Sequence, residues 1–180
     1  MGVTIRAAGP DDAAAIQAIY AHHVLTGTGT FETDPPDLTE IRRRMDKVAG
    51  LGWPWLVACE ASGAVIGYAY AGPFRERAAY ARTVEDSIYV AEGQAGRGIG
   101  RLLLSALIAA CRAAGARQML AVIGDSGNAG SIGLHRALGF GDAGVLREVG
   151  HKFGRDLDVV ILQLSLEAAG PKPGSVGSVG

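Results

Sequence analysis

A glycine-rich turn between a strand pattern and an apolar helix pattern is the feature that most constrains this fold. Residues 94–101 (QAGRGIGR) follow a strand pattern at 84–90 and open a helix pattern at 99–114. Residues without side chains let the backbone approach a ligand closely. The free N–H groups and positive dipole end of the helix attract phosphate, and Arg97 and Arg101 add charge. We therefore expect an anion site, although a plain strand-to-helix turn would leave the same pattern.

The glycine spacing excludes two common nucleotide-binding motifs. A dinucleotide-binding fold has G-x-G-x-x-G near its first strand and an acidic residue about 20 residues later, whereas this turn reads G-x-G-x-G in mid-chain. A P-loop needs Lys followed by Ser or Thr, and the turn has neither.

Composition limits the class of protein. The 180 residues carry a formal net charge of −1 and are 48% hydrophobic, which excludes a disordered polyelectrolyte and argues against a dedicated nucleic-acid binder. Glycine accounts for 27 residues, about twice its usual share. Cys59 and Cys111 cannot form a disulfide framework or a four-ligand zinc site. Adjacent His22 and His23 cannot share one helix face, so no metal is expected.

No secretion signal and no apolar run long enough for a membrane helix are apparent. We therefore expect a cytoplasmic protein without a membrane partner. Residues 1–168 are predicted to form a single domain, and the Gly-, Pro- and Ser-rich segment 169–180 to be a disordered tail.

Hydrophobic periodicity predicts an alternating series of strands and helices. Asp11 or Asp12 is predicted to cap the first helix, and Asp37 with Glu40 to form a capping box for the second. The basic residues 42–44 and 47 are interpreted as a solvated helix face. The order β-α-α-β-β-β-α-β-α-β-β predicts a mixed sheet with helices on both faces. Strands are expected at 3–7, 55–59, 64–70, 84–90, 119–123, 144–149 and 158–166, and the later helices at 99–114 and 129–138.

The turn also resembles the acetyl-CoA signature Gln-x-x-Gly-x-Gly-x-Gly/Ala of the GCN5-related N-acetyltransferases (GNAT). The resemblance covers residues 3–166 and implies an α/β (α+β) fold. Its central sheet would be mixed, mostly antiparallel and of about seven strands, flanked by helices on both faces. It further implies acetyl-CoA as cosubstrate, a pyrophosphate loop at the turn and Asn128 on the pantetheine arm. The implied cofactor residues are Ile88, Tyr89, Val90, Gly96, Arg97, Gly98, Ile99, Gly100, Arg101, Asn128 and Ser131.

Longer motifs are similar to the phosphinothricin N-acetyltransferase group. Members of that group acetylate phosphinothricin, methionine sulfoximine or methionine sulfone, so the resemblance implies a small amino-acid-like substrate and a homodimer. The motifs are WPWLVA at 53–58, YAYAGPF at 68–74, Tyr80, TVEDSIYV at 83–90, AGSIGLH at 129–135 and VGHKFG at 149–154.

Two residues are candidates for acid–base work. Glu85 matches the family's proposed catalytic carboxylate, which would take a proton from the amine directly or through water; a surface strand carboxylate is the alternative. Strand alternation places Glu85 with Ser87 and Tyr89 on one face, opposite Asp86. His135 stands where many family members have a Tyr that protonates the departing thiolate. It is a general acid, a substrate contact, or a helix histidine satisfied by a neighbour.

Substrate recognition needs a cation for the α-carboxylate. Arg75, Arg77 and Arg82 lie near the expected loop, and Lys152 is a further option. Of these, Arg75 matches an Arg of several relatives. Phe31, Tyr80 and Phe153 would line the pocket, or alternatively belong to the core. Residues 78–80 correspond to a segment that reaches the substrate in close relatives, although Ala78 and Ala79 differ from the residues found there. The implied substrate residues are Phe31, Arg75, Ala78, Ala79, Tyr80, Glu85, Lys152 and Phe153.

Two alternative functions stay open. The amine could be another one, such as a polyamine or a protein N-terminus, although the chain shows no acidic cluster that would suit a polyamine. The chain could also be a non-catalytic acyl-CoA-binding regulatory module, against which Glu85 and the intact glycine turn argue.

Overall fold

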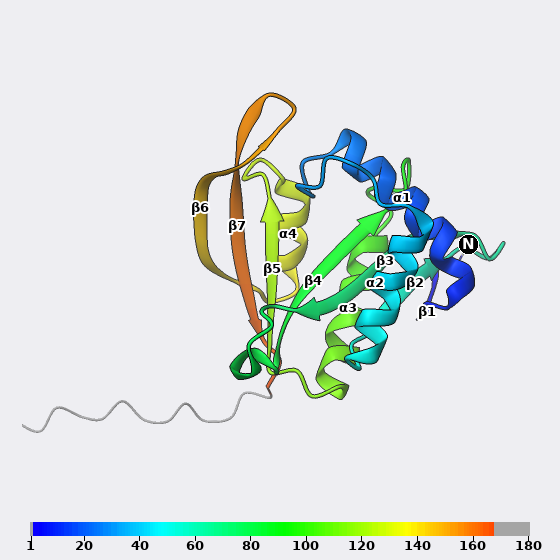
Figure 1. The fold of residues 1–180 in the computed structure, drawn as a ribbon. Helices are drawn as coiled ribbons and strands as arrows, with labels where there is room; N and C mark the ends of the chain where they lie inside the picture. The colour runs from blue at the N-terminus through cyan, green and yellow to red at the C-terminus, as the bar shows by residue number, and fades with distance from the viewer. Residues whose placement is uncertain (1, 168–180) are drawn as a thin grey trace, which may run out of the picture.

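The computed structural model describes residues 2–167, which form one seven-stranded sheet with helices on both faces (Figure 1). The strand order is β1-β2-β3-β4-β5-β7-β6, and β4–β5 is the one parallel pair among the six described. The mixed, mostly antiparallel α/β fold is confirmed, as is the order of elements. The predicted tail at 169–180 and residue 168 lie outside the described residues.

The elements are β1 Thr4–Ala7, α1 Ala13–Thr26, α2 Leu38–Gly50, β2 Trp55–Cys59, β3 Val65–Pro73, β4 Thr83–Val90, α3 Ile99–Ala113, β5 Gln118–Gly124, α4 Ala129–Ala137, β6 Gly141–Lys152 and β7 Arg155–Ser165, with short 3-10 turns at Pro10–Asp12 and Ala78–Tyr80.

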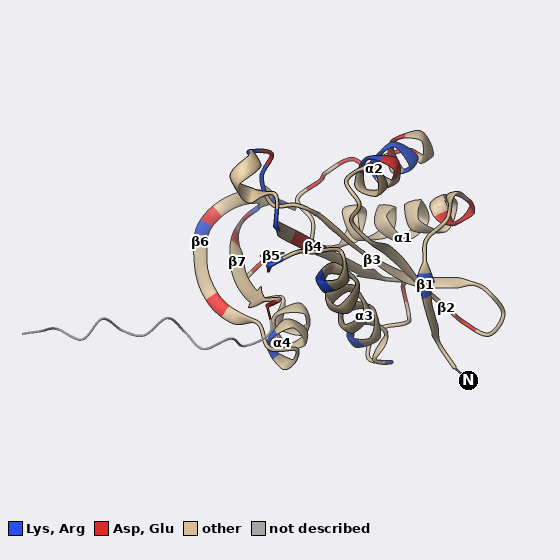
Figure 2. Cartoon of the chain, turned by 90° about the horizontal axis from the view of Figure 1, so that it is seen from below, with Lys and Arg blue, Asp and Glu red and all other residues tan. Residues whose placement is uncertain are grey.

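Helices α1 and α2 cover one face of the sheet and α3 and α4 the other (Figure 2), and each face has its own apolar core. On one face α3 buries an almost continuous apolar surface, with Leu103, Leu104 and Leu107 fully buried against the strands. On the other face α1 and α2 pack over β2 and β3, with Ile16 and Ile41 as buried residues. None of the helices within residues 2–167 combines the length and hydropathy needed to cross a membrane.

The parallel pairing of β4 with β5 is short, and the two strands separate where it ends. Register pairs run from Thr83 with Gln118 to Asp86 with Ala121. Beyond Asp86, β4 stays paired with β3 up to Val90, and β5 stays paired with β7 up to Gly124. The two strands therefore diverge after Asp86, and one edge of β4 loses its neighbour.

Local polar contacts at the first two helices differ from the sequence predictions in two places. Asp12 stands before α1, but its carboxylate accepts the Gly9 N–H at 2.7 Å and pairs with Arg6 at 2.7 Å instead of capping that helix. Asp37 does cap α2, because its Oδ1 accepts the Glu40 N–H at 2.8 Å. The predicted cap at Asp12 is thus wrong. The cap at Asp37 is confirmed, but the capping box is incomplete, because the Glu40 carboxylate accepts from Arg43 and Arg44 and not from the Asp37 N–H.

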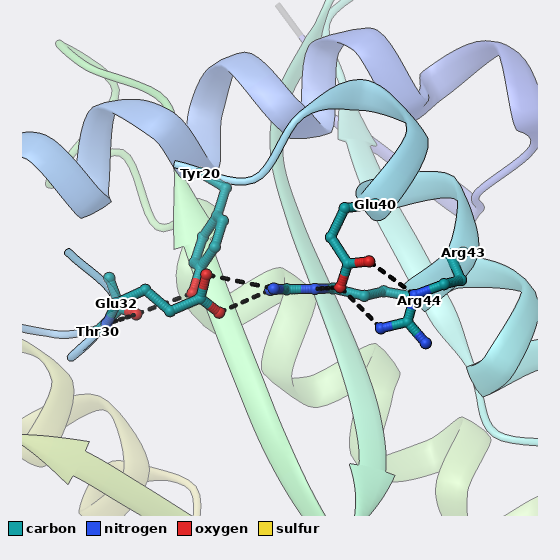
Figure 3. A network of polar contacts seen from close by, with 6 residues as sticks. All are labelled: Tyr20, Thr30, Glu32, Glu40, Arg43 and Arg44. Carbon is teal, nitrogen blue, oxygen red and sulfur yellow. Dashed lines mark hydrogen bonds and ion pairs between the residues drawn. The ribbon is translucent and has the colours of Figure 1, made fainter. Parts of the chain in front are cut away.

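The basic run on α2 is not uniformly a solvated face. Arg44 reaches back toward the sheet and donates to Glu32 at 2.7 Å and to Glu40 at 2.8 Å (Figure 3). Its guanidinium lies 6.0 Å from the ring centre of Tyr20. Glu32 belongs to the segment between α1 and α2, so Arg44 fastens that segment to α2.

We expect Asp37→Ala to lower the free energy of unfolding by about 1 kcal/mol, because the start of α2 loses its side-chain acceptor. Urea denaturation measures the change. Asp46→Ala removes the same charge from an exposed position of α2 and serves as control. An equal loss in both variants would contradict the capping role.

Candidate active site where two strands diverge

A cleft of about 840 Å³ lies along the line where β4 and β5 separate. Its floor comes from residues 86–90 of β4 and 121–123 of β5, and its walls come from three connecting segments. These segments are residues 27–29 after α1, the glycine turn before α3, and the start of α4. The volume is that of a typical ligand site.

The glycine turn forms the wall at the start of α3. Gly96 and Gly98 both have φ of +77°, a left-handed conformation that residues with a side chain rarely adopt. The first helical bond of α3 runs from the Leu102 N–H to the Gly98 carbonyl, so the N–H groups of the first turn have no helical partner. Arg101 lines the cleft at the same place. The predicted anion site is therefore physically available.

Arg97 points elsewhere. Its guanidinium donates to Glu60 at 3.0 Å and to Gln94, and it lines a small separate hollow beside β2. It is not among the residues that line the main cleft. The described geometry thus separates Arg97 from the other cofactor candidates of the turn.

The free edge of β4 presents Ile88, Tyr89 and Val90 to the cleft. The Val90 carbonyl accepts a hydrogen bond from His23 Nε2 on α1 at 2.8 Å. Since a carbonyl can only accept, this nitrogen carries the proton, and burial lowers the pKa of His23, which favours the neutral ring. The adjacent pair His22–His23 gave no sign of this contact, because the partner lies 67 residues away.

The start of α4 supplies the opposite wall. Asn128 caps the helix by accepting the Ser131 N–H at 3.2 Å, and both residues line the cleft. The Asn128 amide lies close to Gly29 on the segment after α1. Asn128, the predicted pantetheine contact, and Ser131, another cofactor candidate, thus lie together along this wall of the cleft.

A buried ion pair joins β4 to α4 at the point of divergence. His135 Nε2 lies 2.9 Å from Asp86 Oδ2, and the side chains are 4% and 2% exposed. His135 Nδ1 donates to the Ser131 carbonyl at 2.7 Å. Burial by itself lowers the pKa of His135, but the hydrogen bond and charge of Asp86 outweigh it and raise the pKa. Both ring nitrogens are therefore engaged, and sequence reasoning missed Asp86 as the partner.

Glu85 lies on the other face of β4. The alternation is as expected, because Ile88 and Val90 pack with the α3 core whereas Tyr89 packs with the α1–α2 core. Glu85 is half-buried. Burial, and then the charge of Asp86, raise its pKa, while Arg75 acts in the opposite direction. A carboxylate whose pKa is raised in this way suits a general base.

Arg75 and Tyr80 meet around Phe74 in the segment that leads into β4. The Arg75 guanidinium lies 4.4 Å from the ring centre of Phe74 and donates to its carbonyl at 3.1 Å. The Tyr80 ring meets Phe74 edge-on at 5.7 Å. Within residues 2–167, no carboxylate lies within ion-pair distance of Arg75. Ala78 and Ala79 belong to the same exposed turn.

The other substrate candidates lie at the β6–β7 turn and the segment facing it. Lys152 is buried, and its Nζ donates to two backbone carbonyls of the segment after α1. Phe153 is 56% exposed with φ of +54°. Phe31 packs against the bare backbone of Gly124 and Gly150. These three residues are therefore grouped together, apart from Arg75 and Tyr80.

Among residues 2–167, no group of three or more His, Cys, Asp or Glu side chains is arranged to hold a metal ion.

Comparison with known proteins gives relatives that span nearly the whole chain. A phosphinothricin N-acetyltransferase from Alcaligenes faecalis is 54% identical over 92% of this chain and 83% of its own length. An L-methionine sulfoximine/L-methionine sulfone acetyltransferase from Pseudomonas paraeruginosa is 44% identical over 96% of this chain and all of its own. A crystal structure of a phosphinothricin acetyltransferase from Sinorhizobium meliloti with acetyl-CoA superposes with a TM-score of 0.89. It is 46% identical and covers 92% of this chain and 89% of the other.

The matching domain family accounts for the same region as the sheet and the cleft. Residues 5–161 match the family described as the acetyltransferase (GNAT) domain. This match and the relatives establish that the chain belongs to the GNAT acetyltransferase family and is an acetyltransferase.

Proposed function

We propose that this protein transfers the acetyl group of acetyl-CoA to the α-amine of a small amino-acid analogue, within a ternary complex. Phosphinothricin, methionine sulfoximine and methionine sulfone are the expected acceptors. The proposal rests mainly on the position of β4 between the places for the two reactants. One face and the free edge of β4 line the cleft beside the glycine turn, which would hold acetyl-CoA. The other face carries Glu85, beside which the amine would bind.

The residues of the cleft fit acetyl-CoA. Free N–H groups at the start of α3 and the Arg101 side chain suit its pyrophosphate, and the unpaired edge of β4 suits its pantetheine amides, with Asn128 on the other side. When bound, acetyl-CoA supplies a thioester carbonyl that an amine can attack. Main-chain N–H groups of the segment 88–90 stabilise the negative charge that develops on the carbonyl oxygen.

Glu85 acts as the general base. The attacking α-amine is an ammonium at neutral pH and must lose a proton, which Glu85 accepts directly or through water. The raised pKa of Glu85 lies closer to neutral pH than that of an ordinary glutamate, which makes the carboxylate a stronger base. It lies on the face of β4 opposite the Asp86–His135 pair, and the charge of Asp86 contributes to its raised pKa.

Arg75 holds the substrate carboxylate. Its planar guanidinium can bind a carboxylate through two parallel hydrogen bonds, and it influences the charge of Glu85. Lys152, the other candidate cation, already donates to two carbonyl groups. We therefore assign the α-carboxylate to Arg75, with Tyr80 as a neighbouring wall.

His135 holds β4 and α4 in place. To protonate the departing thiolate it would first have to give up its bond to Asp86 or to Ser131. We therefore assign it a positioning role with Asp86 in preference to general acid catalysis.

The cytoplasmic location and the homodimer stay predictions. Strand β6 lies at one edge of the sheet, where a second copy could contact it, and it exposes Val145, Leu146 and Val149.

We expect acetyl-CoA-dependent thiol release with phosphinothricin and with methionine sulfone. Glu85→Gln should lower kcat/KM by about 10²-fold or more, because the amine loses its base, while the fold remains intact by circular dichroism. Glu76→Gln, at an exposed position, is the control and should retain activity. Turnover of neither amine would overturn the substrate class. CoA binding without turnover on a broad amine panel would favour a regulatory module.

We expect Arg75→Gln to raise KM for the amino-acid substrate by about tenfold, since a charged hydrogen-bond donor is lost. The same change should raise the pKa of Glu85, because the guanidinium holds it down. The acid limb of the kcat/KM profile, where the base becomes protonated, should therefore move to higher pH. Arg77→Gln in the same exposed segment is the control. An unmoved limb together with an unchanged KM would exclude Arg75 from the site.

We expect His135→Gln to lower the free energy of unfolding by about 3–5 kcal/mol near pH 6, because it leaves Asp86 buried without its partner. The folded-state pKa of His135 is raised. The ion pair therefore stabilises fully below the unfolded pKa of about 6.5 and fades as pH rises through the folded pKa. Urea titrations on both sides of that interval should show the difference from wild type shrinking with rising pH. A constant difference would show that the ring is not protonated in the fold.

A further inference from the structure

Lys152 is a buried lysine that the proposed reaction does not use. Its residue is 4% exposed, whereas lysines are almost never fully buried without a partner. Nζ donates to the Gly27 and Thr30 carbonyls, each at 2.8 Å. Within residues 2–167, no carboxylate lies within ion-pair distance of Nζ. Both hydrogen bonds that the Lys152 ammonium donates therefore go to backbone carbonyls of the segment 27–30.

Two further contacts join the same parts of the molecule. Arg155, at the start of β7, donates to Asp125 Oδ2 at 2.9 Å, and that oxygen accepts the Thr28 hydroxyl at 2.8 Å. The Phe31 ring packs on Gly150 of β6 and on Gly124 of β5. Residues at the tip of the β6–β7 hairpin thus contact residues 27–31, which lie beside it in the fold (Figure 1).

The other side of this segment is anchored as well. The Thr30 hydroxyl lies 2.8 Å from the Tyr20 hydroxyl, and Glu32 is held by Arg44 (Figure 3). The segment therefore has one attachment to the α1–α2 layer and one to the β6–β7 hairpin. Within residues 2–167, the side-chain hydrogen bonds to residues 27–29 come from Lys152 and Asp125, and the Gly27 N–H also donates to the His23 carbonyl of α1 at 2.9 Å. Residues 27–29 line the cleft next to Asn128.

We propose that Lys152 is a positioning residue that holds the wall formed by residues 27–29 at the width that acetyl-CoA requires. This inference rests on the proposed use of acetyl-CoA. Gly27 and Gly29 carry no side chain and Thr28 only a short one, so beyond the bond of the Gly27 N–H to α1 their position depends on the contacts from Lys152 and Asp125. Without the ammonium, the carbonyls of Gly27 and Thr30 lose their buried donors and the wall moves.

The test is Lys152→Met, which keeps most of the side-chain volume and removes the donors. We expect the dissociation constant of CoA by calorimetry and KM for acetyl-CoA to rise about tenfold, the equivalent of one lost buried hydrogen bond. KM for the amino-acid substrate should stay nearly unchanged. A rise confined to the amine KM would instead make Lys152 a substrate contact and overturn the proposal.

A steric variant moves the same wall and leaves Lys152 intact. A Cβ on Gly124 would lie 2.5 Å from the Thr28 carbonyl oxygen and 2.8 Å from the Phe31 ring. Gly124→Ala should therefore push residues 28–31 away from β5 and raise the dissociation constant of CoA in the same direction. Gly144→Ala in β6, where an added Cβ meets no atom within 4 Å, is the control.

The outcomes separate the two proposals. Wild-type protein that fails to bind CoA would sink the proposed function itself. Wild-type binding that a folded Lys152→Met variant leaves unchanged would overturn only the role of Lys152, whatever Gly124→Ala does. Thermal unfolding of each variant without ligand shows whether it folds. If Lys152→Met does not fold, an unchanged dissociation constant in Gly124→Ala would overturn the dependence of CoA binding on this wall, and with it the role of Lys152.

Discussion

The separation of β4 from β5 after Asp86 is the constraint on which the rest of the site depends. A strand inside a sheet normally satisfies both edges, and an unpaired backbone group away from water is unfavourable. Here the residues after Asp86 keep β3 on one edge and lose β5 on the other. The resulting free edge is an unfilled strand position inside the fold, and a ligand with amide groups of its own is a suitable occupant. The glycine turn lies at the far end of that edge, where α3 begins.

Strand alternation then divides two kinds of chemistry between the faces of β4. Glu85 and Asp86 are neighbours in the chain, yet one belongs to the α1–α2 side and the other is sealed against α4 by His135. The charge of Asp86 adds to burial in raising the pKa of Glu85, and the hydrogen bond and charge of Asp86 outweigh burial and raise the pKa of His135. In the proposed reaction, a single strand binds one reactant along its edge and activates the other from its face.

The sequence predicts those features whose causes are local. The glycine turn is one, because positive φ at Gly96 and Gly98 and the start of α3 lie within a few residues; the Asp37 cap is another. Contacts between distant segments were not predictable. Lys152 meets residues 122 and 125 positions away, and His135 meets Asp86 across 49 positions. The pairing of Arg97 with Glu60, 37 positions away, was not predictable for the same reason, and its role toward the cofactor stays a prediction.

Within residues 2–167, most of the buried polar and charged side chains lie around the cleft, and Asp12, which pairs with Arg6 before α1, is the exception. Lys152, His135 and Asp86 are all buried, and each acts on a segment that lines the cleft. Buried charges stabilise a fold less than apolar residues of similar volume do, so stability alone does not account for them. What directed hydrogen bonds supply is position: they fix where a backbone segment lies, which apolar contacts do less strictly. A cleft whose walls are fixed before the ligand arrives loses less conformational freedom on binding, and this gives the costly buried groups a functional reason.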